Sequence, residues 1–218
     1  MTSHERRVGR EAVVRAALEL LGEVGLEGLT LRAIAARLGV RAPTLYWRFA
    51  NKQDLVDEMA TQVMLDWRAR FGEQAWPGSW RELVSRYAHS YRDELLKYRD
   101  GARMLAGTRL RDPAVYAGME AFLVALRGDG IEPAEAALCL KTTNDFVIGF
   151  TIEQQAVLSP TGERTAGYEP EARAAQAAAY PLAASIGPVL FGDFDGAFRQ
   201  GLDLILGGFA ARLAGARS

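Results

Sequence analysis

Hydrophobic residues recur at helical spacing along almost the whole chain. Val14, Leu18, Leu21 and Val24 are four, three and three positions apart, which places them on one face of a helix. The next stripe follows the i, i+3, i+4, i+7 pattern with Leu31, Ile34, Ala35 and Leu38. We find no convincing alternation of apolar and polar residues of the kind that a half-buried strand shows. The pattern predicts an all-α protein.

Capping and turn residues divide the N-terminal part into three helices. Gly25 and Gly28 interrupt the first stripe, and Thr30 is a good N-cap because its hydroxyl can accept from free amides of the next helix. Gly39 stands where a left-handed C-cap is usual, and Pro43 suits the first turn of a third, short helix. Residues 30–52 therefore have the pattern of a helix-turn-helix.

The third helix places two neighbouring aromatic residues away from the core. Leu45 and Phe49 are four positions apart and are expected to face inward, which leaves Tyr46 and Trp47 pointing largely elsewhere. The less favoured alternative is that these two aromatics are themselves core residues.

The rest of the chain is also expected to be helical. Asn51 and Asp54 resemble a cap pair that starts a long linking helix ending near Phe71. Further helices are predicted near residues 80–98, 102–109, 113–127, 133–158 and 193–213. Residues 159–170 are polar and rich in turn formers, which favours a mobile loop or a disordered link.

A shift in composition at residues 72–79 marks the expected domain junction. The predicted fold is an N-terminal three-helix helix-turn-helix domain at 1–52, with a linking helix to about 71, and a larger helical domain at 72–218.

Charge is spread unevenly along the chain. Residues 1–52 hold nine Arg/Lys and five Asp/Glu, whereas the remainder holds seventeen and twenty-two. A basic N-terminal part on an acidic body fits a protein whose N-terminal end meets phosphate; chance clustering is the alternative.

Composition excludes several kinds of site. Cys139 is the only cysteine and the chain has two histidines, so an internal disulfide and the usual Cys/His zinc site are excluded. We therefore expect no metal and no other cofactor. The sequence has no run of about 18 apolar residues and no signal-peptide core, so we expect a cytoplasmic protein without a membrane span.

The helix-turn-helix predicts contacts with double-stranded DNA. Its second helix would enter the major groove, where Thr44 can hydrogen-bond a base or phosphate and Ala42 and Pro43 can contact a thymine methyl. The remaining candidates are basic or aromatic residues that reach base edges or grip the sugar–phosphate backbone: Arg32, Arg41, Tyr46, Trp47, Arg48 and Lys52. Arg37 is expected to be a solvated residue instead.

Residues 23–60 resemble the DNA-binding domain of the tetracycline-repressor (TetR) family. The resemblance is densest at 39–52, where the chain reads GV, then PTLYW, then NK. Weaker similarity continues at 79–80 (SW), 99–102 (RDGA), 107–109 (GTR) and Glu153. The resemblance implies a homodimer that binds a near-palindromic operator and a C-terminal ligand-binding and dimerisation domain. It implies that a small organic effector releases the DNA.

The resemblance also implies where an effector would bind. Large apolar residues at helical spacing in the middle of the chain could equally form an ordinary core. Among the polar residues beside them, Asn144, Asp145 and Glu153 can cap a pocket, pair with Arg109 or face solvent. The candidate effector-binding residues are Tyr87, Tyr91, Met104, Leu105, Thr108, Arg109, Met119, Phe122, Asp145, Phe146 and Glu153.

The family pattern fails where tetracycline recognition would need it. The family's tetracycline-binding members hold a magnesium–drug chelate with a histidine at the position of Leu105, and a leucine cannot ligate magnesium. Their drug-contacting asparagine, histidine and glutamine positions are Tyr87, Arg68 and Phe122 here, and Leu110 replaces a proline. We therefore expect a different effector, more apolar or aromatic and bound without metal.

The C-terminal helix carries an apolar stripe that fits either a core or an interface: Phe194, Phe198, Leu202, Ile205 and Phe209. The resemblance implies that this helix and the one near 133–158 form a four-helix dimer bundle.

The favoured function is a ligand-responsive transcriptional repressor. Two alternatives remain open, a DNA-binding regulator without an effector and an all-helical small-molecule enzyme. Against the enzyme, the sequence has no phosphate-binding glycine loop and no nucleophile motif.

Overall fold

The computed structural model describes residues 9–72, 78–159 and 161–216 of the chain. Within these ranges the regular structure is helical, and the one β-type feature is an isolated antiparallel bridge between Leu158 and Arg164. The helices are α1 (Arg10–Gly28), α2 (Leu31–Arg37), α3 (Ala42–Tyr46), α4 (Lys52–Gly72), α5 (Trp80–Leu96), α6 (Gly101–Leu105), α7 (Val115–Gly128), α8 (Pro133–Val157), α9 (Pro170–Gln176), α10 (Pro181–Phe191) and α11 (Phe194–Ala216). The all-α prediction is confirmed.

The described residues form two compact units that interleave along the chain. The first unit lies within residues 1–75 and 93–122, and the second within 76–92 and 123–218. This division differs from the domains expected from sequence, which follow chain order. The core of the expected junction, residues 73–77, lies outside the described ranges.

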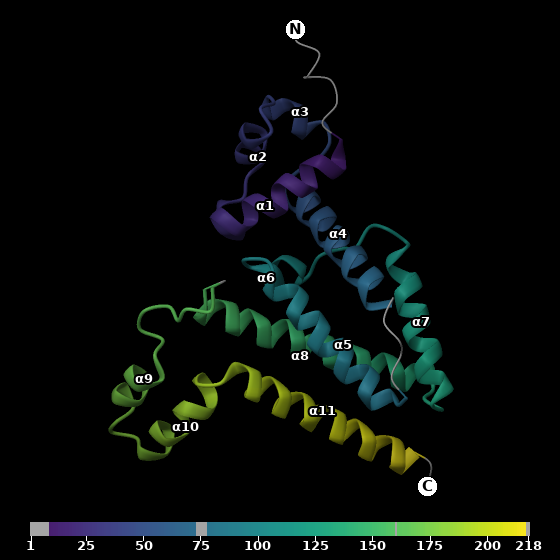
Figure 1. Cartoon of the computed structure of the whole chain (residues 1–218), viewed down its shortest axis with the longest axis vertical. Coiled ribbons are helices and arrows are strands. Elements are labelled where there is room, and N and C mark those ends of the chain that lie inside the picture. The colour runs from purple at the N-terminus through teal and green to yellow at the C-terminus, as the bar shows by residue number, and fades with distance from the viewer. Residues whose placement is uncertain (1–8, 73–77, 160, 217–218) are drawn as a thin grey trace. The chain divides into compact units, whose positions relative to one another are not determined.

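The first unit begins with three helices gathered at one end of α4 (Figure 1). Their shared core contains Leu21, Ile34, Leu45 and Phe49, each with no exposed side-chain surface. The apolar stripes of α1 and α2 and the inward pair of α3 thus meet, as their spacing predicts. Burial of such side chains is worth about 1.5–3 kcal/mol each, which holds these short helices together.

Local caps define where the short helices begin and end. Thr30 Oγ1 accepts from the Ala33 amide at 3.1 Å, and Gly39 adopts φ +64°, the left-handed conformation that favours glycine. The amide of Asp54 donates to Asn51 Oδ1 at 2.9 Å at the start of α4. These capping expectations are confirmed.

A tight contact links the end of α1 to the start of α6 within the first unit. Asp100 Oδ2 accepts from the amide of Leu26 at 2.8 Å, and Arg99 Nη1 donates to the carbonyl of Glu23 at 3.0 Å. Gly25 lies beneath this contact with φ +70°, and a Cβ there would come within 2.9 Å of Asp100 Oδ2. Glycine is therefore required at this position for both backbone conformation and space.

The second unit is built around α8 and α11, which lie side by side (Figure 1), and the N-terminal part of α5. Phe198 of α11 is fully buried and stacks on Phe146 of α8 with ring centroids 5.2 Å apart. A Cβ at Gly201 would meet the Phe146 ring at 2.8 Å, so glycine permits this close approach. Trp80 packs edge-on against Phe209 at 5.2 Å. Much of the C-terminal stripe is thus core of the protomer itself.

Two segments differ from their sequence-based description. The helix expected at 102–109 ends at Leu105, because Ala106 is extended and Gly107 has φ +71°, which breaks the regular α-helical backbone. In the segment expected to be mobile, Ser159 N donates to the Glu163 carbonyl at 2.7 Å and Thr165 N to that of Val157 at 2.9 Å. The described part of 159–170 therefore has defined backbone pairing.

None of the helices in the described ranges is both long and apolar enough to cross a membrane.

Candidate DNA-reading helix and effector-binding residues

Side chains on and just after α3 are either buried in the core or exposed to solvent. Leu45 and Phe49 are fully buried, whereas neighbouring Trp47 is 90% exposed and Tyr46 is 52% exposed. Trp47 is the C-cap residue directly after α3, and a side chain so exposed contributes little to the fold. The structure places both aromatics outside the core, as the spacing of Leu45 and Phe49 indicates, and their contacts with DNA remain a prediction.

The other DNA-binding candidates on and before α3 differ in exposure. Pro43, Arg32 and Arg41 are exposed, and Thr44 and Ala42 are partly buried. Pro43 lies in the first turn of α3, where its missing amide leaves no bond unmade.

Arg48 lies just after α3 and is held through its backbone. Its carbonyl accepts from Arg10 Nη1 at 2.6 Å, while Arg10 Nη2 pairs with Glu58 of α4 at 2.7 Å. The Arg10 guanidinium also lies over the Phe49 ring, 4.5 Å from its centroid. Arg10 thus joins the end of the reading helix to α4. No pattern in the sequence singles out Arg10.

Lys52 has an intramolecular contact that the sequence analysis missed. Its Nζ donates to the carbonyl of Leu26 at 2.5 Å and lies 3.5 Å from that of Glu27. These carbonyls belong to the last turn of α1, where helix carbonyls lack intrahelical partners and a cation is favourable. Lys52 therefore fixes α1 to the start of α4, besides any contact with phosphate.

Arg37 is ion-paired rather than simply solvated. It lies 2.6 Å from Glu23 and 3.4 Å from Glu19, both on α1. The hydrogen bond with Glu23 raises the pKa of Arg37 above its usual value. Arg37 thus ties α2 to α1.

The effector candidates in the first unit are mostly apolar and buried. Met104, Leu105 and Phe122 are buried and Met119 is partly exposed. Thr108 Oγ1 donates to the Leu105 carbonyl at 2.8 Å, so its hydroxyl caps the end of α6. The side chain of Arg109 is exposed.

The effector-binding candidates in the second unit are aromatic residues and exposed acidic residues. Tyr87 and Tyr91 are buried with ring centroids 6.0 Å apart, and the Tyr87 hydroxyl donates to Asn144 Oδ1 at 2.6 Å. Asp145 is exposed and pairs with Lys141 at 2.6 Å. Phe146 packs on Phe198 and Glu153 is exposed. Asn144 is thus satisfied inside the unit, whereas Asp145 faces outward.

The first unit contains a buried polar cluster that sequence reasoning missed. Asp57 of α4 is 6% exposed and accepts from the Arg109 amide at 3.3 Å, from Arg111 Nη2 at 3.2 Å and from Gln53 Nε2 at 2.9 Å. Buried Thr61 accepts from the Arg111 amide at 3.0 Å. Burial acts to raise the pKa of Asp57, but these hydrogen bonds outweigh it and lower the pKa below 3.8.

One signal in the sequence could have drawn attention to this cluster. Asp57 and Thr61 are four residues apart and lie among the apolar residues of α4, so they share a face with buried neighbours. Their partners Arg109 and Arg111, which are 50 to 54 positions away, could not be read from spacing.

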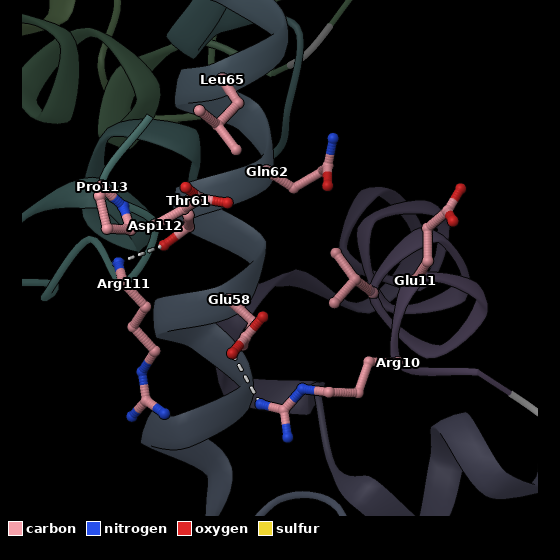
Figure 2. Close-up of a pocket in the computed structure, with 10 residues that line it drawn as sticks. Arg10, Glu11, Glu58, Thr61, Gln62, Leu65, Arg111, Asp112 and Pro113 are labelled. Atoms are coloured by element: carbon pink, nitrogen blue, oxygen red, sulfur yellow. Dashed lines mark hydrogen bonds and ion pairs between the residues drawn. The ribbon is translucent and has the colours of Figure 1, made fainter. Parts of the chain in front are cut away.

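An open groove of about 460 Å³ adjoins this cluster (Figure 2). Figure 2 shows Arg10 and Glu58 paired on one side and Arg111 beside Thr61 on the other. The groove is lined by residues of α1, of α4 and of the loop before α7, and by none of the predicted effector-binding residues.

Within the described residues, no group of three or more His, Cys, Asp or Glu side chains is placed to hold a metal ion. Cys139 is buried, and burial raises the pKa of its thiol to about 11.

Two family profiles together match most of the chain. Residues 13–59 match the family profile described as bacterial regulatory proteins, tetR family. Residues 74–213 match the profile described as tetracyclin repressor-like, C-terminal domain.

Individual relatives extend this match. The tetracycline repressor protein class C of Escherichia coli is 40% identical over 202 residues, which cover 93% of this chain and 90% of that protein. The structure of a possible TetR family transcriptional regulator from Streptomyces coelicolor A3(2) matches with a TM-score of 0.79 and 37% identity, covering 93% of this chain and 99% of that one. The S. coelicolor protein ActR, solved in complex with actinorhodin, matches with a TM-score of 0.77 and 26% identity, covering 94% and 98%.

These matches confirm the predicted family, the all-α fold with an N-terminal helix-turn-helix, and the predicted function class of ligand-responsive transcriptional repressor. The chain belongs to the tetR family of bacterial regulatory proteins and has the tetracyclin repressor-like C-terminal domain.

Proposed function

We propose that this repressor binds a near-palindromic operator as a homodimer through α3. We further propose that it is released by an organic effector, more apolar or aromatic than a magnesium–tetracycline chelate, which binds without metal. The proposal includes no catalytic step and places the protein in the cytoplasm, with the DNA.

The exposure of Trp47 beside fully buried Leu45 supports the DNA-binding part most directly. Leaving a large apolar ring in water has no benefit for the fold, but an aromatic edge beside Pro43 and Thr44 suits a groove wall of sugars and thymine methyls. Arg32, Arg41 and Arg48 add positive charge around the same surface, where phosphate contacts supply affinity. A dimer presents two such helices about one DNA turn apart, which calls for a near-palindrome.

The chemistry of the candidate residues supports the effector part. Leu105, at the position of the expected magnesium ligand, is buried and offers no donor atom. Tyr87 and Phe122 are buried aromatics where the tetracycline-binding pattern has amide side chains, and the Tyr87 hydroxyl is occupied by Asn144. Such groups favour contact with flat, apolar ligands over chelation of a hydrated ion.

The relatives favour two different effector classes. The tetracycline repressor of E. coli suggests a tetracycline, and the ActR complex suggests that this fold also accepts actinorhodin. We favour an effector that resembles actinorhodin. The residues at which this chain differs from the tetracycline-binding pattern are those on which metal-dependent recognition depends.

Release requires that the effector bind the DNA-free arrangement more tightly than the DNA-bound one. An effector with equal affinity for both would leave operator binding unchanged. The effector must therefore weaken operator binding, and the operator must weaken effector binding by the same factor.

The DNA-binding part is tested by selection from a randomised duplex library, followed by mobility shift. We expect enrichment of an inverted repeat bound by two protomers. Selection of no duplex, or a bound monomer, would contradict it.

The effector part is tested by isothermal titration with tetracycline plus Mg²⁺ and, separately, with actinorhodin in a chelator. We expect the first to show no chelator-sensitive binding and the second to bind and to release the selected duplex. Micromolar tetracycline binding that a chelator abolishes would overturn the metal-free assignment.

A further inference from the structure

We infer that Arg10 is a positioning residue for operator recognition, which holds Trp47 and Arg48 in the orientation that specific DNA binding requires. The inference rests on the proposed function, because it names a residue on which operator choice through α3 depends. Arg10 acts through the backbone that follows α3, and its guanidinium is not itself a DNA contact.

The backbone that follows α3 needs a donor from another part of the chain. The amides of Arg48 and Phe49 both donate to the carbonyl of Leu45 at 2.9 Å, which closes the last turn of this short helix. The carbonyl of Arg48 lies past that turn, where helix carbonyls lack intrahelical donors, and α4 begins only at Lys52. The orientation of this carbonyl therefore depends on a contact from outside α3.

Arg10, the first residue of α1, supplies that contact. Its Nη1 donates to the Arg48 carbonyl at 2.6 Å. The same peptide unit donates to Leu45 through the amide of Phe49, so it is bonded at both its oxygen and its nitrogen. Because a peptide unit is planar, these two bonds fix the direction in which the chain leaves α3. The Cα atom of Arg48 is thereby fixed as well.

The Arg10 guanidinium is itself held by two further contacts. Its Nη2 pairs with Glu58 of α4 at 2.7 Å, the contact that Figure 2 draws between these two helices, and its carbon lies 4.5 Å from the centroid of the Phe49 ring. Phe49 is fully buried, so this ring is a rigid support. A guanidinium combines these contacts because its donors lie in one plane whose face stacks on an aromatic ring, which an ammonium cannot match.

Fixing this backbone also fixes the side chains that leave it toward solvent. Trp47 is 90% exposed and Arg48 is partly buried, and both are candidates for contacts with the sugar–phosphate backbone. Contacts of this kind set the register and tilt of a protein on the duplex. If Trp47 and Arg48 moved, Pro43 and Thr44 would meet the base edges at a different height. Arg10 can therefore influence base preference without contacting a base.

The surroundings of Arg10 argue against a direct contact with phosphate. Its Nη1 and Nη2 atoms are both engaged, and the carboxylate of Glu58 lies beside them. A phosphate at this place would meet a negative charge as close as the positive one. The Arg10 side chain is nevertheless 42% exposed, so the experiment has to distinguish positioning from phosphate contact.

The experiment compares two duplexes, the one that the full-length wild-type protein selects from a randomised library and a scrambled duplex of the same composition. Both are titrated at several salt concentrations, at a temperature where circular dichroism shows each variant folded. Arg10→Met removes the donors and keeps an unbranched stem over Phe49. Glu58→Gln removes the carboxylate that orients Arg10, and it changes the net charge in the opposite direction.

We expect the ratio of affinities, selected over scrambled duplex, to fall by about 5- to 30-fold in Arg10→Met, as for a lost hydrogen bond from a charged group. The ratio should also fall in Glu58→Gln. Affinity for the scrambled duplex should instead move in opposite directions, down in Arg10→Met and up in Glu58→Gln, because it follows net charge. A phosphate contact would predict a higher affinity of Glu58→Gln for both duplexes at an unchanged ratio.

The matched control is Arg15→Met, which removes the same charge from the same helix. Arg15 forms an exposed pair with Glu11 at 2.7 Å, so its loss should weaken both duplexes by a similar factor and leave the ratio at its wild-type value. The slope of log affinity against log salt concentration should be the same in Arg10→Met and Arg15→Met. A slope lower by about one in Arg10→Met would make Arg10 a phosphate contact and overturn the inference.

The outcomes separate the inference from the proposed function. If wild type prefers its selected duplex and the ratio in Arg10→Met equals that in Arg15→Met, the inference is overturned and DNA binding stands. If Arg10→Met does not fold, Glu58→Gln decides, and an unchanged ratio there overturns the inference. If the wild-type protein selects no duplex at all, the proposed function fails and the inference fails with it.

Discussion

The ammonium group of Lys52, the first residue of α4, donates a hydrogen bond to the carbonyl oxygen of Leu26 near the end of α1. A residue that the sequence assigns to the DNA backbone therefore also closes the three-helix core of the first unit. A substitution of Lys52 is therefore expected to change both protein stability and DNA binding, and the two effects have to be measured separately.

Replacing Lys52 by Met should lower the free energy of unfolding by about 1 kcal/mol without any DNA present, because a cation leaves the carbonyl end of α1. Urea unfolding measures the change. Arg32→Gln is the control, since it removes an exposed cation of the same surface and should weaken DNA binding at unchanged stability. Equal stability of Lys52→Met and wild type would show that the contact with Leu26 contributes nothing.

Leu45 and Trp47 should respond to alanine in opposite ways, although they are two residues apart. Leu45→Ala opens a cavity under α3 and should cost about 2–5 kcal/mol of stability. Trp47→Ala should change stability by less than about 0.5 kcal/mol, because the ring is 90% exposed, and should weaken operator binding. Thermal unfolding and mobility shift on the same samples provide both measurements. Full operator affinity in Trp47→Ala would remove the ring from the DNA interface.

Arg48→Ala should reduce affinity for every duplex by a similar factor. A lost phosphate contact also reduces the slope of log affinity against log salt concentration by about one. Titration of the selected duplex and of unrelated duplexes at several salt concentrations tests this. A variant that altered base preference alone would assign Arg48 to a base edge.

Thr44→Val should instead change base preference, at about 1–3 kcal/mol for a lost base contact. Repeating the selection with the variant shows whether the preferred base changes at one position of each half-site. An unchanged preferred sequence with uniformly weaker binding would place Thr44 on phosphate.

The pKa of Asp57 predicts a loss of stability in acid. Because hydrogen bonds from Gln53, Arg109 and Arg111 outweigh burial and lower this pKa below 3.8, the folded protein binds the proton less readily than the unfolded chain does. The stabilising contribution is therefore fully present above the unfolded pKa and is lost as pH falls through the folded one. Asp57→Asn should be less stable than wild type at neutral pH, and the difference should shrink below pH 3.8. A difference that stays constant across this range in urea unfolding would contradict the assignment.

The DNA-reading helices could be predicted because their signals are local. Thr30, Gly39 and Pro43 act on neighbours within a few positions, and Leu45 and Phe49 are related by a single helical turn. Such short-range rules fix caps, turns and inward faces without knowledge of the rest of the fold.

The contacts around α4 could not be predicted because they join distant parts of the chain. Arg111 and Asp57 are 54 positions apart, and Lys52 and Leu26 are 26 apart. The end of α6 differs from the prediction for a separate, local reason, because the left-handed conformation of Gly107 cannot be inferred from the spacing of apolar residues. The effector candidates came from family resemblance, and their buried apolar character fits an ordinary core as well as a ligand site.

The hydrogen bond that the Leu26 amide donates to Asp100 spans 74 positions of the chain, and Arg99 donates to the carbonyl of Glu23 beside it. Recombination at the end of α4 therefore cannot exchange the DNA-reading segment without breaking these two contacts. A hybrid repressor with a foreign N-terminal segment would need a glycine at position 25 and an acceptor at position 100 that fit each other. Operator preference can thus change through substitutions on α3. Exchange of the whole N-terminal segment is limited to repressors that have a matching glycine and acceptor at positions 25 and 100.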